Sequence, residues 1–161
     1  MSETHPRNPR VLIGYGLVVI VAVALDQWIK YWVETHMAMH ERIDIVPMLA
    51  LFRTHNTGIA FSLLSEFGSV GLVVMTGAVT LFVLYLAAKS EPHQRWARLG
   101  FALIIGGAIG NLIDRVMYGY VIDFLDFHVA GWHWPAFNVA DAGIVVGAAM
   151  FILDELRSPK H

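Results

Sequence analysis

In the stretch PAFNVADAGIVVGAAMFILDEL, residues 135–156, a carboxylate stands at the entrance of an apolar run. Between Asp141 and Asp154 the chain carries no charge. A membrane-spanning helix needs about 20 mostly apolar residues, so residues 142–153 are too few to span alone. This segment spans only if Asp141 and a few residues before it belong to the helix. A charge at membrane depth costs several kcal/mol, so Asp141 needs a functional explanation.

The composition of the whole chain also indicates a membrane protein. Of its 161 residues, 57% are hydrophobic and 15% are charged, and the mean hydropathy is +0.58. Soluble domains carry about 25% charged residues. The length fits one domain, residues 1–161, and the net charge of −2 gives no basic surface for nucleic acid. Cysteine is absent, which excludes disulfides, a thiolate nucleophile and a cysteine metal site.

Four apolar runs predict an all-α integral membrane fold with four transmembrane helices. The predicted spans are residues 11–33, 67–88, 97–116 and 137–156. A bundle of two or three spans with one buried helix is the alternative. The first run also resembles a cleavable signal peptide, because Arg7 and Arg10 precede it and residues 22–24 read Ala-Val-Ala. The apolar residues that continue to Val33 argue against cleavage.

The distribution of lysine and arginine predicts the orientation of the bundle. Seven lie at one side of the predicted bundle: Arg7, Arg10, Lys89, Arg95, Arg98, Arg157 and Lys160. Four lie at or near the other side: Lys30, Arg42, Arg53 and Arg115. Positive residues favour the cytoplasmic face. Both termini are therefore predicted to be cytoplasmic, and residues 34–66 and 116–137 are predicted to face outward.

In this topology the embedded polar residues lie together near the outward-facing side of the membrane. They lie late in the first and third helices and early in the fourth: Asp26, Lys30, Asn111, Asp114, Arg115, Asn138 and Asp141. Long side chains at helix ends can reach the interface by themselves. Aspartate and asparagine are too short for this, so a shared polar site is the better interpretation. Asp26 and Lys30, four residues apart, predict an ion pair on one helix face.

The outer segment before the fourth helix combines acids with aromatic residues. Asp123 and Asp126 lie close to Trp132 and Trp134, which are typical of a membrane interface. Two carboxylates that share a site cannot both ionise cheaply, so one keeps a proton. An aspartyl protease needs such a pair. The pattern alone is also compatible with an ordinary acidic loop.

Two further features bear on the outer face. Residues 42–52, RIDIVPMLALF, alternate in part between polar and apolar, which predicts a small β-containing platform between the first and second helices. An ordinary connecting loop is the alternative. His128 and His133 do not have the spacing of metal ligands on a helix, so we expect no metal site.

Five sequence blocks, in order, resemble those of the lipoprotein signal peptidases, the type II signal peptidases of bacteria. They are DQWIK at 26–30, HNTGIAFS at 55–62, GGAIGNLIDR at 106–115, VIDF at 121–124 and FNVADAGIVVG at 137–147. The resemblance implies an aspartyl endopeptidase of the bacterial inner membrane that removes signal peptides from lipid-modified prolipoproteins. The cut would fall before the diacylglyceryl-cysteine. Prolipoproteins, membrane lipid and globomycin-type inhibitors are the implied partners, and no metal or cofactor is implied.

The resemblance also assigns roles to residues of this chain. It implies that Asp123 and Asp141 are the catalytic pair. It implies that four residues line the cleft for substrate and inhibitor: Asn56, Asn111, Arg115 and Asn138. It implies that three others hold the site together: Asp26, Lys30 and Asp114. Ile59 and Ala142 depart from the family pattern, where alanine and a hydroxyl residue are expected, which affects substrate preference more than chemistry.

Two other classes of function compete with a protease. Intramembrane Asp, Asn and Arg could form the pathway of a small proton- or ion-coupled transporter. That function predicts polar residues along the full depth of the bundle, whereas the predicted cytoplasmic halves are apolar. A non-catalytic assembly protein is the third possibility, and it predicts that neither aspartate is needed.

Overall fold

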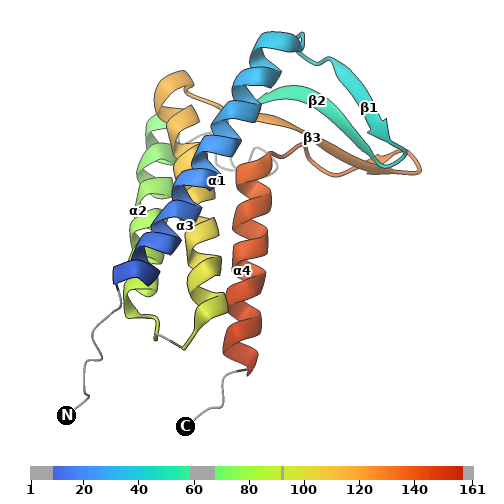
Figure 1. Ribbon diagram of the computed structural model, residues 1–161. Coiled ribbons are helices and arrows are strands. Elements are labelled where there is room, and N and C mark those ends of the chain that lie inside the picture. The colour runs from blue at the N-terminus through green and yellow to red at the C-terminus, as the bar shows by residue number, and fades with distance from the viewer. Residues whose placement is uncertain (1–8, 59–67, 92, 158–161) are drawn as a thin grey trace, which may run out of the picture.

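The described residues form a bundle of four helices with a small antiparallel sheet at one end (Figure 1). The structure, a computed structural model, describes residues 9–58, 68–91 and 93–157. The helices are α1 (Pro9–His36), α2 (Gly68–Lys89), α3 (Arg95–Tyr118) and α4 (Val139–Arg157). Helix α3 packs against all three others and is the most buried of them. The sheet lies where α1 and α3 end and α4 begins.

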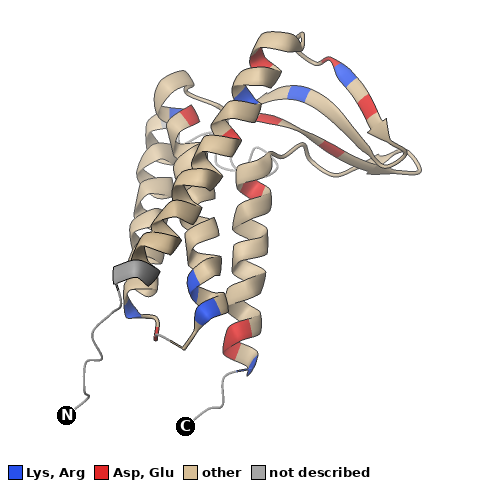
Figure 2. Ribbon diagram, viewed as in Figure 1, with Lys and Arg blue, Asp and Glu red and all other residues tan. Residues whose placement is uncertain are grey.

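Three of the described helices are long and apolar enough to cross a membrane: Leu12–His36, Val70–Lys89 and Arg95–Tyr118. Helix α4 does include Asp141 in its first turn, as spanning would require, but Asp154, Glu155 and Arg157 add charge at its other end. The number of spans therefore stays a prediction. Figure 2 shows the charged residues gathered towards the two ends of the bundle, with the middle of the helices largely free of them.

Glycines let α3 and α4 approach within backbone contact. A Cβ added at Gly107 would overlap the carbonyl oxygen of Ala140, and one added at Gly100 would overlap that of Gly147. Such small-residue contacts are typical of helix packing in membranes, where association depends on close van der Waals contact. This approach brings the first turn of α4 against the polar end of α3.

Within the part of the chain that the structure describes, the sheet contains four antiparallel strands in the order β1-β2-β3-β4. Strands β1 (Arg42–Val46) and β2 (Leu49–Asn56) lie between α1 and α2, as predicted. Strands β3 (Val121–Val129) and β4 (Trp132–His133) lie between α3 and α4. The prediction that placed the platform between the first two helices alone was therefore incomplete. Aromatic residues of the second outer segment read as an interfacial loop, and its pairing with β2 is long-range and leaves little local signal.

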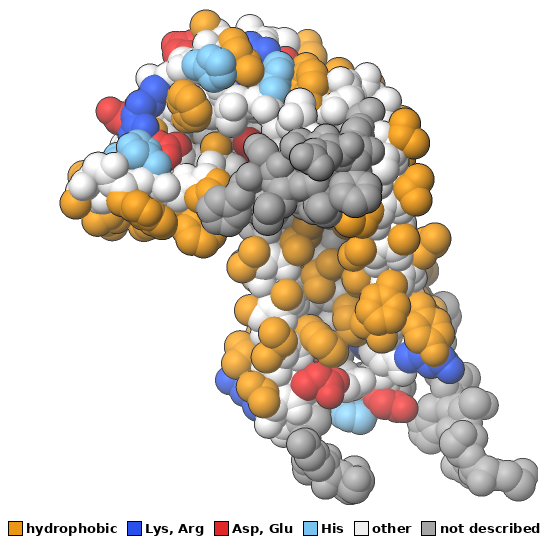
Figure 3. All heavy atoms as spheres, turned by 180° about the vertical axis from the view of Figure 1, so that it is seen from behind, with side chains coloured by type: hydrophobic (Ala, Val, Ile, Leu, Met, Phe, Trp, Pro, Cys, Tyr) orange, Lys and Arg blue, Asp and Glu red, His pale blue; other side chains and the backbone are white. Residues whose placement is uncertain are grey.

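The outer half of the sheet projects beyond the bundle and has one polar and one apolar face. Successive side chains of a strand point to opposite faces. On β1, Arg42 and Asp44 therefore lie opposite Ile43 and Ile45, and all four are exposed or partly exposed. On β3, Phe127 and Val129 are likewise exposed apolar residues. Figure 3 shows apolar side chains along the lower edge of this arm and charged and histidine side chains above.

Candidate active site

Helix α4 begins with a reciprocal cap that contains Asp141. The side-chain oxygen of Asn138 accepts a hydrogen bond from the Asp141 N–H at 2.9 Å, and Asp141 Oδ2 accepts one from the Asn138 N–H at 3.2 Å. This pairing satisfies two backbone donors, as in a capping box. The helix dipole also favours a negative group in the first turn. The cap explains the position of Asp141 in the helix but leaves its second oxygen, Oδ1, for other partners.

The second oxygen of Asp141 faces α3. Side-chain amides of asparagine residues donate hydrogen bonds to this oxygen and also to Asp123. Asp141 Oδ1 accepts a hydrogen bond from Asn111 Nδ2 at 2.8 Å. Asp123 Oδ1 accepts one from Asn138 Nδ2 at 2.7 Å, and Asp123 Oδ2 accepts one from Asn56 Nδ2 at 3.0 Å. Asn138 therefore donates to both carboxylates, through its backbone to Asp141 and through its side chain to Asp123. Asp123 and Asp141, the catalytic pair that the resemblance implies, are thus connected through Asn138.

Burial of Asp123 changes the pKa of its carboxyl group. Only 2% of the residue is exposed. This burial, followed by the negative charge of Asp141, raises the pKa of Asp123 from 3.8 to about 7, although the hydrogen bonds from Asn56 and Asn138 act in the opposite direction. Burial and a like charge both disfavour the ionised form of a carboxyl group. Asp123 is thus suited to carry a proton near neutral pH.

A buried ion network holds the backbone beside each aspartate. Lys30 Nζ lies 2.8 Å from carboxylate oxygens of both Asp26 and Asp114. Asp26 accepts a hydrogen bond from the Ala140 N–H at 3.0 Å, and Asp114 accepts one from the Ile122 N–H at 3.1 Å.

Ala140 and Ile122, whose N–H groups bind this network, immediately precede Asp141 and Asp123. The predicted ion pair between Asp26 and Lys30 is present, and Lys30 also donates to Asn111 Oδ1 at 3.0 Å. The charged side chains of Asp26, Lys30 and Asp114 are almost fully buried. The network therefore connects α1 and α3 to both aspartate-bearing segments.

Arg115 lies at the same end of α3 and points to the turn after β2. Its Nη2 donates to the carbonyl oxygen of Gly58 at 3.1 Å, and the Gly58 N–H donates to Asn56 Oδ1 at 2.9 Å. Arg115 Nε is buried and has no hydrogen-bond partner among the described residues. Ile59, one of the two departures from the family pattern, lies outside the described residues. Ala142, the other departure, lines an apolar groove formed with α1 and α3.

Several supporting residues were not identified from the sequence. Gln27 donates to Asp114 Oδ1 at 2.8 Å and to the Gly110 carbonyl oxygen at 3.1 Å, and so completes the ion network. Glu34, at the end of α1, accepts from Arg53 and His55 of β2, each at 2.7 Å. Gln27 lies next to Asp26 in the DQWIK motif, which is a local signal, whereas the contacts of Glu34 depend on the position of β2.

Asp126 takes no part in this arrangement. It lies three residues after Asp123 on β3, so its side chain points to the other face of the sheet. There it forms an ion pair with Arg42 and contacts His133 Nδ1 at 2.9 Å. Burial raises its pKa, but the hydrogen bonds from His133 and Arg42 outweigh burial and hold the pKa below 3.8. Among the described residues, Asp126, His128 and His133 could hold a metal ion.

The sequence is similar to a known family and to known proteins of that family. Residues 18–157 match the family model for signal peptidase (SPase) II. A lipoprotein signal peptidase of Mesorhizobium japonicum is 58% identical over 142 residues, which are 88% of this chain and 84% of that protein. One of Brucella ovis is 56% identical over 138 residues, 86% of each chain.

Solved structures share the fold of this chain. One described as a bacterial membrane enzyme aligns with a TM-score of 0.82 and 28% identity, and covers 92% of this chain and 93% of that one. A second with the same description has a TM-score of 0.81, also at 28% identity, and covers 91% of this chain and 94% of that one. The expectation drawn from the five sequence blocks is confirmed, and the chain belongs to the signal peptidase II family.

Proposed function

We propose that this protein is a membrane aspartyl endopeptidase that removes the signal peptide from lipid-modified prolipoproteins, before the diacylglyceryl-cysteine. Membership of the signal peptidase II family supports the reaction class. The observation that carries the assignment of the catalytic pair is the shared amide of Asn138, which donates to Asp123 and, through its backbone, to Asp141. An aspartyl protease requires two neighbouring carboxyl groups, one of them protonated.

In this proposal Asp123 is the acid and Asp141 the base. Asp141 accepts a proton from a water molecule as the water oxygen adds to the scissile carbonyl carbon. Asp123 donates its proton to the carbonyl oxygen. As the tetrahedral intermediate collapses, the C–N bond breaks, the departing amine takes the proton from Asp141, and a hydroxyl of the intermediate returns a proton to Asp123. The raised pKa of Asp123, about 7, supports its role as the proton carrier.

The neighbouring polar groups position this pair and the substrate. Asn111 and Asn138 hold Asp141 and Asp123 through side-chain amides at 2.8 and 2.7 Å, so we assign them an orienting role beside the expected role in substrate binding. Asn56 shares both roles through its bond to Asp123. Arg115 contacts the turn that carries Asn56, because its Nη2 donates to the Gly58 carbonyl oxygen, and this position supports its expected role in substrate binding.

The expected activity is directly measurable. Purified, detergent-solubilised protein should cleave a prolipoprotein that carries diacylglyceryl on its cysteine and should leave the matched unlipidated precursor intact. The products are identified by the mass of the mature N-terminus. Equal cleavage of both precursors would contradict the proposed substrate class, and cleavage of neither by well-folded protein would contradict the proposed function.

The pH dependence of cleavage should report the proton on Asp123. The active form carries one proton on the pair, so kcat/KM should fall as the pH rises through about 7, where Asp123 ionises. Asn56 stabilises the ionised form through its hydrogen bond, so Asn56→Ala should raise this pKa and move the alkaline limb to higher pH. Thr57→Ala, an exposed neighbour in the same turn, is the control and should leave the limb in place. An unchanged or lower limb in Asn56→Ala would contradict the assignment.

We further propose that all four helices cross the bacterial inner membrane, with both termini in the cytoplasm and the aspartate pair near the outer face. The excess of lysine and arginine at the ends of the helices away from the sheet supports this orientation. The exposed apolar face of the sheet includes Ile43, Ile45 and Phe127. This face supports contact of the platform with the outer surface of the inner membrane (Figure 3).

A topology reporter tests this orientation. Fusion after Ser90, between α2 and α3, should read as cytoplasmic, and insertion near Gly131, between β3 and β4, should read as external. Paired reporters that are active on opposite sides, such as a phosphatase and a fluorescent protein, give the readout. The same side for both positions would contradict the proposed bundle.

The transporter alternative lacks support. The buried charged side chains of the described helices lie at one end of the bundle, beside the sheet: Asp26, Lys30, Asp114 and Arg115. Neither the family nor the described side chains point to a polar path through the remaining depth.

A further inference from the structure

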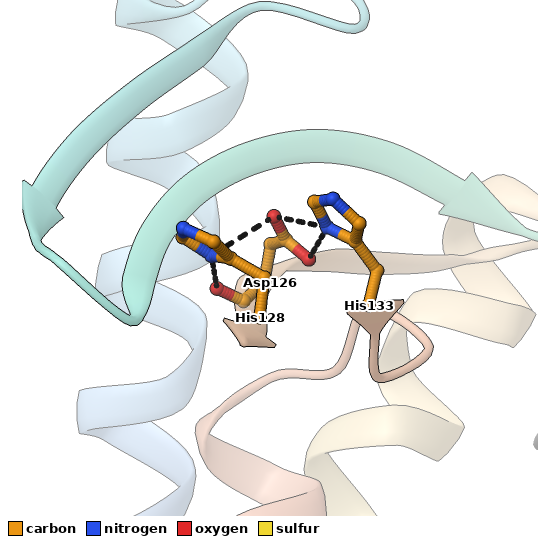
Figure 4. Close-up of side chains that lie close together, drawn as sticks. All are labelled: Asp126, His128 and His133. Carbon is orange, nitrogen blue, oxygen red and sulfur yellow. Dashed lines mark hydrogen bonds and ion pairs between the residues drawn. The ribbon is translucent and has the colours of Figure 1, made fainter. Parts of the chain in front are cut away.

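The polar face of the sheet carries a second cluster of titratable side chains, on the opposite face of β3 from Asp123. Asp126 and His128 lie on β3, two residues apart, and His133 lies directly opposite His128 on β4 (Figure 4). Two residues apart on a strand means the same face, and directly paired residues of antiparallel strands also share a face. The spacing of the two histidines does not fit metal ligands on a helix, and their pairing depends on the register of β3 and β4.

We propose that Asp126, His128 and His133 form a binding site for one transition-metal ion of the Zn²⁺ class. Each residue offers one donor atom, and these atoms all lie within 4.8 Å of one another. His133 Nδ1 is 2.9 Å from Asp126 Oδ1, and His128 Nδ1 is 3.7 Å from Asp126 Oδ2. Two donors bound tetrahedrally to Zn²⁺ at about 2.0 Å lie about 3.3 Å apart, so small side-chain rotations suffice.

The donor set selects the type of ion. Two imidazoles and a carboxylate suit Zn²⁺, Co²⁺, Ni²⁺ and Cu²⁺, whereas Mg²⁺ and Ca²⁺ prefer oxygen ligands alone. Three protein ligands leave a fourth position open for water. The side chain of His133 is 49% exposed, which gives an ion a route from solvent, and the side chain of Asp126 is only 6% exposed.

Arg42 is the cation that contacts this site in the structure. Its guanidinium forms an ion pair with Asp126, and its Nη2 lies 3.1 Å from both ring nitrogens of His128. About a third of the Arg42 side chain is exposed, and Asp44, which is 72% exposed, offers it a second carboxylate at 3.0 Å. Arg42 can therefore turn to Asp44 and leave the site. Because two cations compete for Asp126, removal of Arg42 should strengthen metal binding.

Metal titration of the full-length protein tests this proposal. The protein is purified in detergent without a polyhistidine tag and titrated with Zn²⁺ by calorimetry, and with Co²⁺ by absorption spectroscopy, which detects tetrahedral coordination. We expect one ion per chain. Affinity should fall at least tenfold in His128→Ala and in His133→Ala, and should rise at least tenfold in Arg42→Ala. Mg²⁺ should not compete.

Matched variants separate this site from adventitious histidine binding. His93→Ala, in the exposed connection between α2 and α3, should leave stoichiometry and affinity unchanged. Thermal unfolding of each variant confirms that the protein is folded, and His133→Gln, which keeps a polar side chain, serves if His133→Ala unfolds. Undiminished binding by folded His128→Ala and His133→Ala variants would overturn the proposal. So would an Arg42→Ala variant that binds Zn²⁺ no more tightly than the parent.

Discussion

Asp123→Asn and Asp141→Asn should each reduce cleavage of a lipidated prolipoprotein by at least about a thousandfold while the protein remains folded. An amide keeps the shape of the side chain and can still hydrogen-bond, but it cannot take a proton from water or deliver one as a carboxylic acid does. The amide oxygen of the new side chain can still accept the hydrogen bond from Asn138 at position 123, or from Asn111 at position 141. Because the two acids act as one unit, the double variant should be scarcely less active than either single variant.

The readout is the ratio of precursor to mature lipoprotein on a gel, with the amount of enzyme in the membrane fraction measured in parallel. Asp154→Asn is the matched control, because Asp154 lies at the opposite end of α4 and accepts a hydrogen bond from the Ala97 N–H. It should process lipoproteins normally. Normal processing by a well-expressed Asp123→Asn or Asp141→Asn variant would refute the aspartyl mechanism.

Lys30→Met should cause the second large effect, a loss of both stability and activity. Lys30 is 1% exposed and neutralises two buried carboxylates. Its removal leaves Asp26 and Asp114 without a cation, and breaking a buried ion pair in this way costs about 3–5 kcal/mol. The same carboxylates accept hydrogen bonds from the N–H groups of Ala140 and Ile122, so the aspartate pair should also lose its alignment.

Thermal unfolding in detergent measures the stability term, and kcat of the folded fraction measures the alignment. The control is Lys89→Met at the end of α2, where the ammonium group lies 5.7 Å from the Tyr85 ring and is removed at little cost. Adding Asp114→Asn to Lys30→Met should recover part of the lost stability, because one unpaired charge is removed, without restoring activity. Wild-type stability of Lys30→Met alone would contradict a structural role for the network.

Much of the fold could be predicted because its signals are local. Long apolar runs indicate helices regardless of what they contact, and the predicted span 97–116 lies within α3, Arg95–Tyr118. The predicted ion pair of Asp26 and Lys30 could be found because its residues are one helical turn apart. The aspartates were singled out because charge is rare in apolar sequence, and family resemblance selected Asp123 over Asp126.

The helical, membrane-type character of the chain, its family and the gathering of polar residues near one end therefore follow from the sequence alone. The contacts among those polar residues follow from the packed structure. The bond from Asn138 to Asp123, the anchoring of Ile122 and Ala140 by the ion network, and the facing of His128 and His133 all depend on strand register and on the contact of α3 with α4. These contacts join segments far apart in the chain, and their positions follow from the packing of the whole molecule rather than from local periodicity.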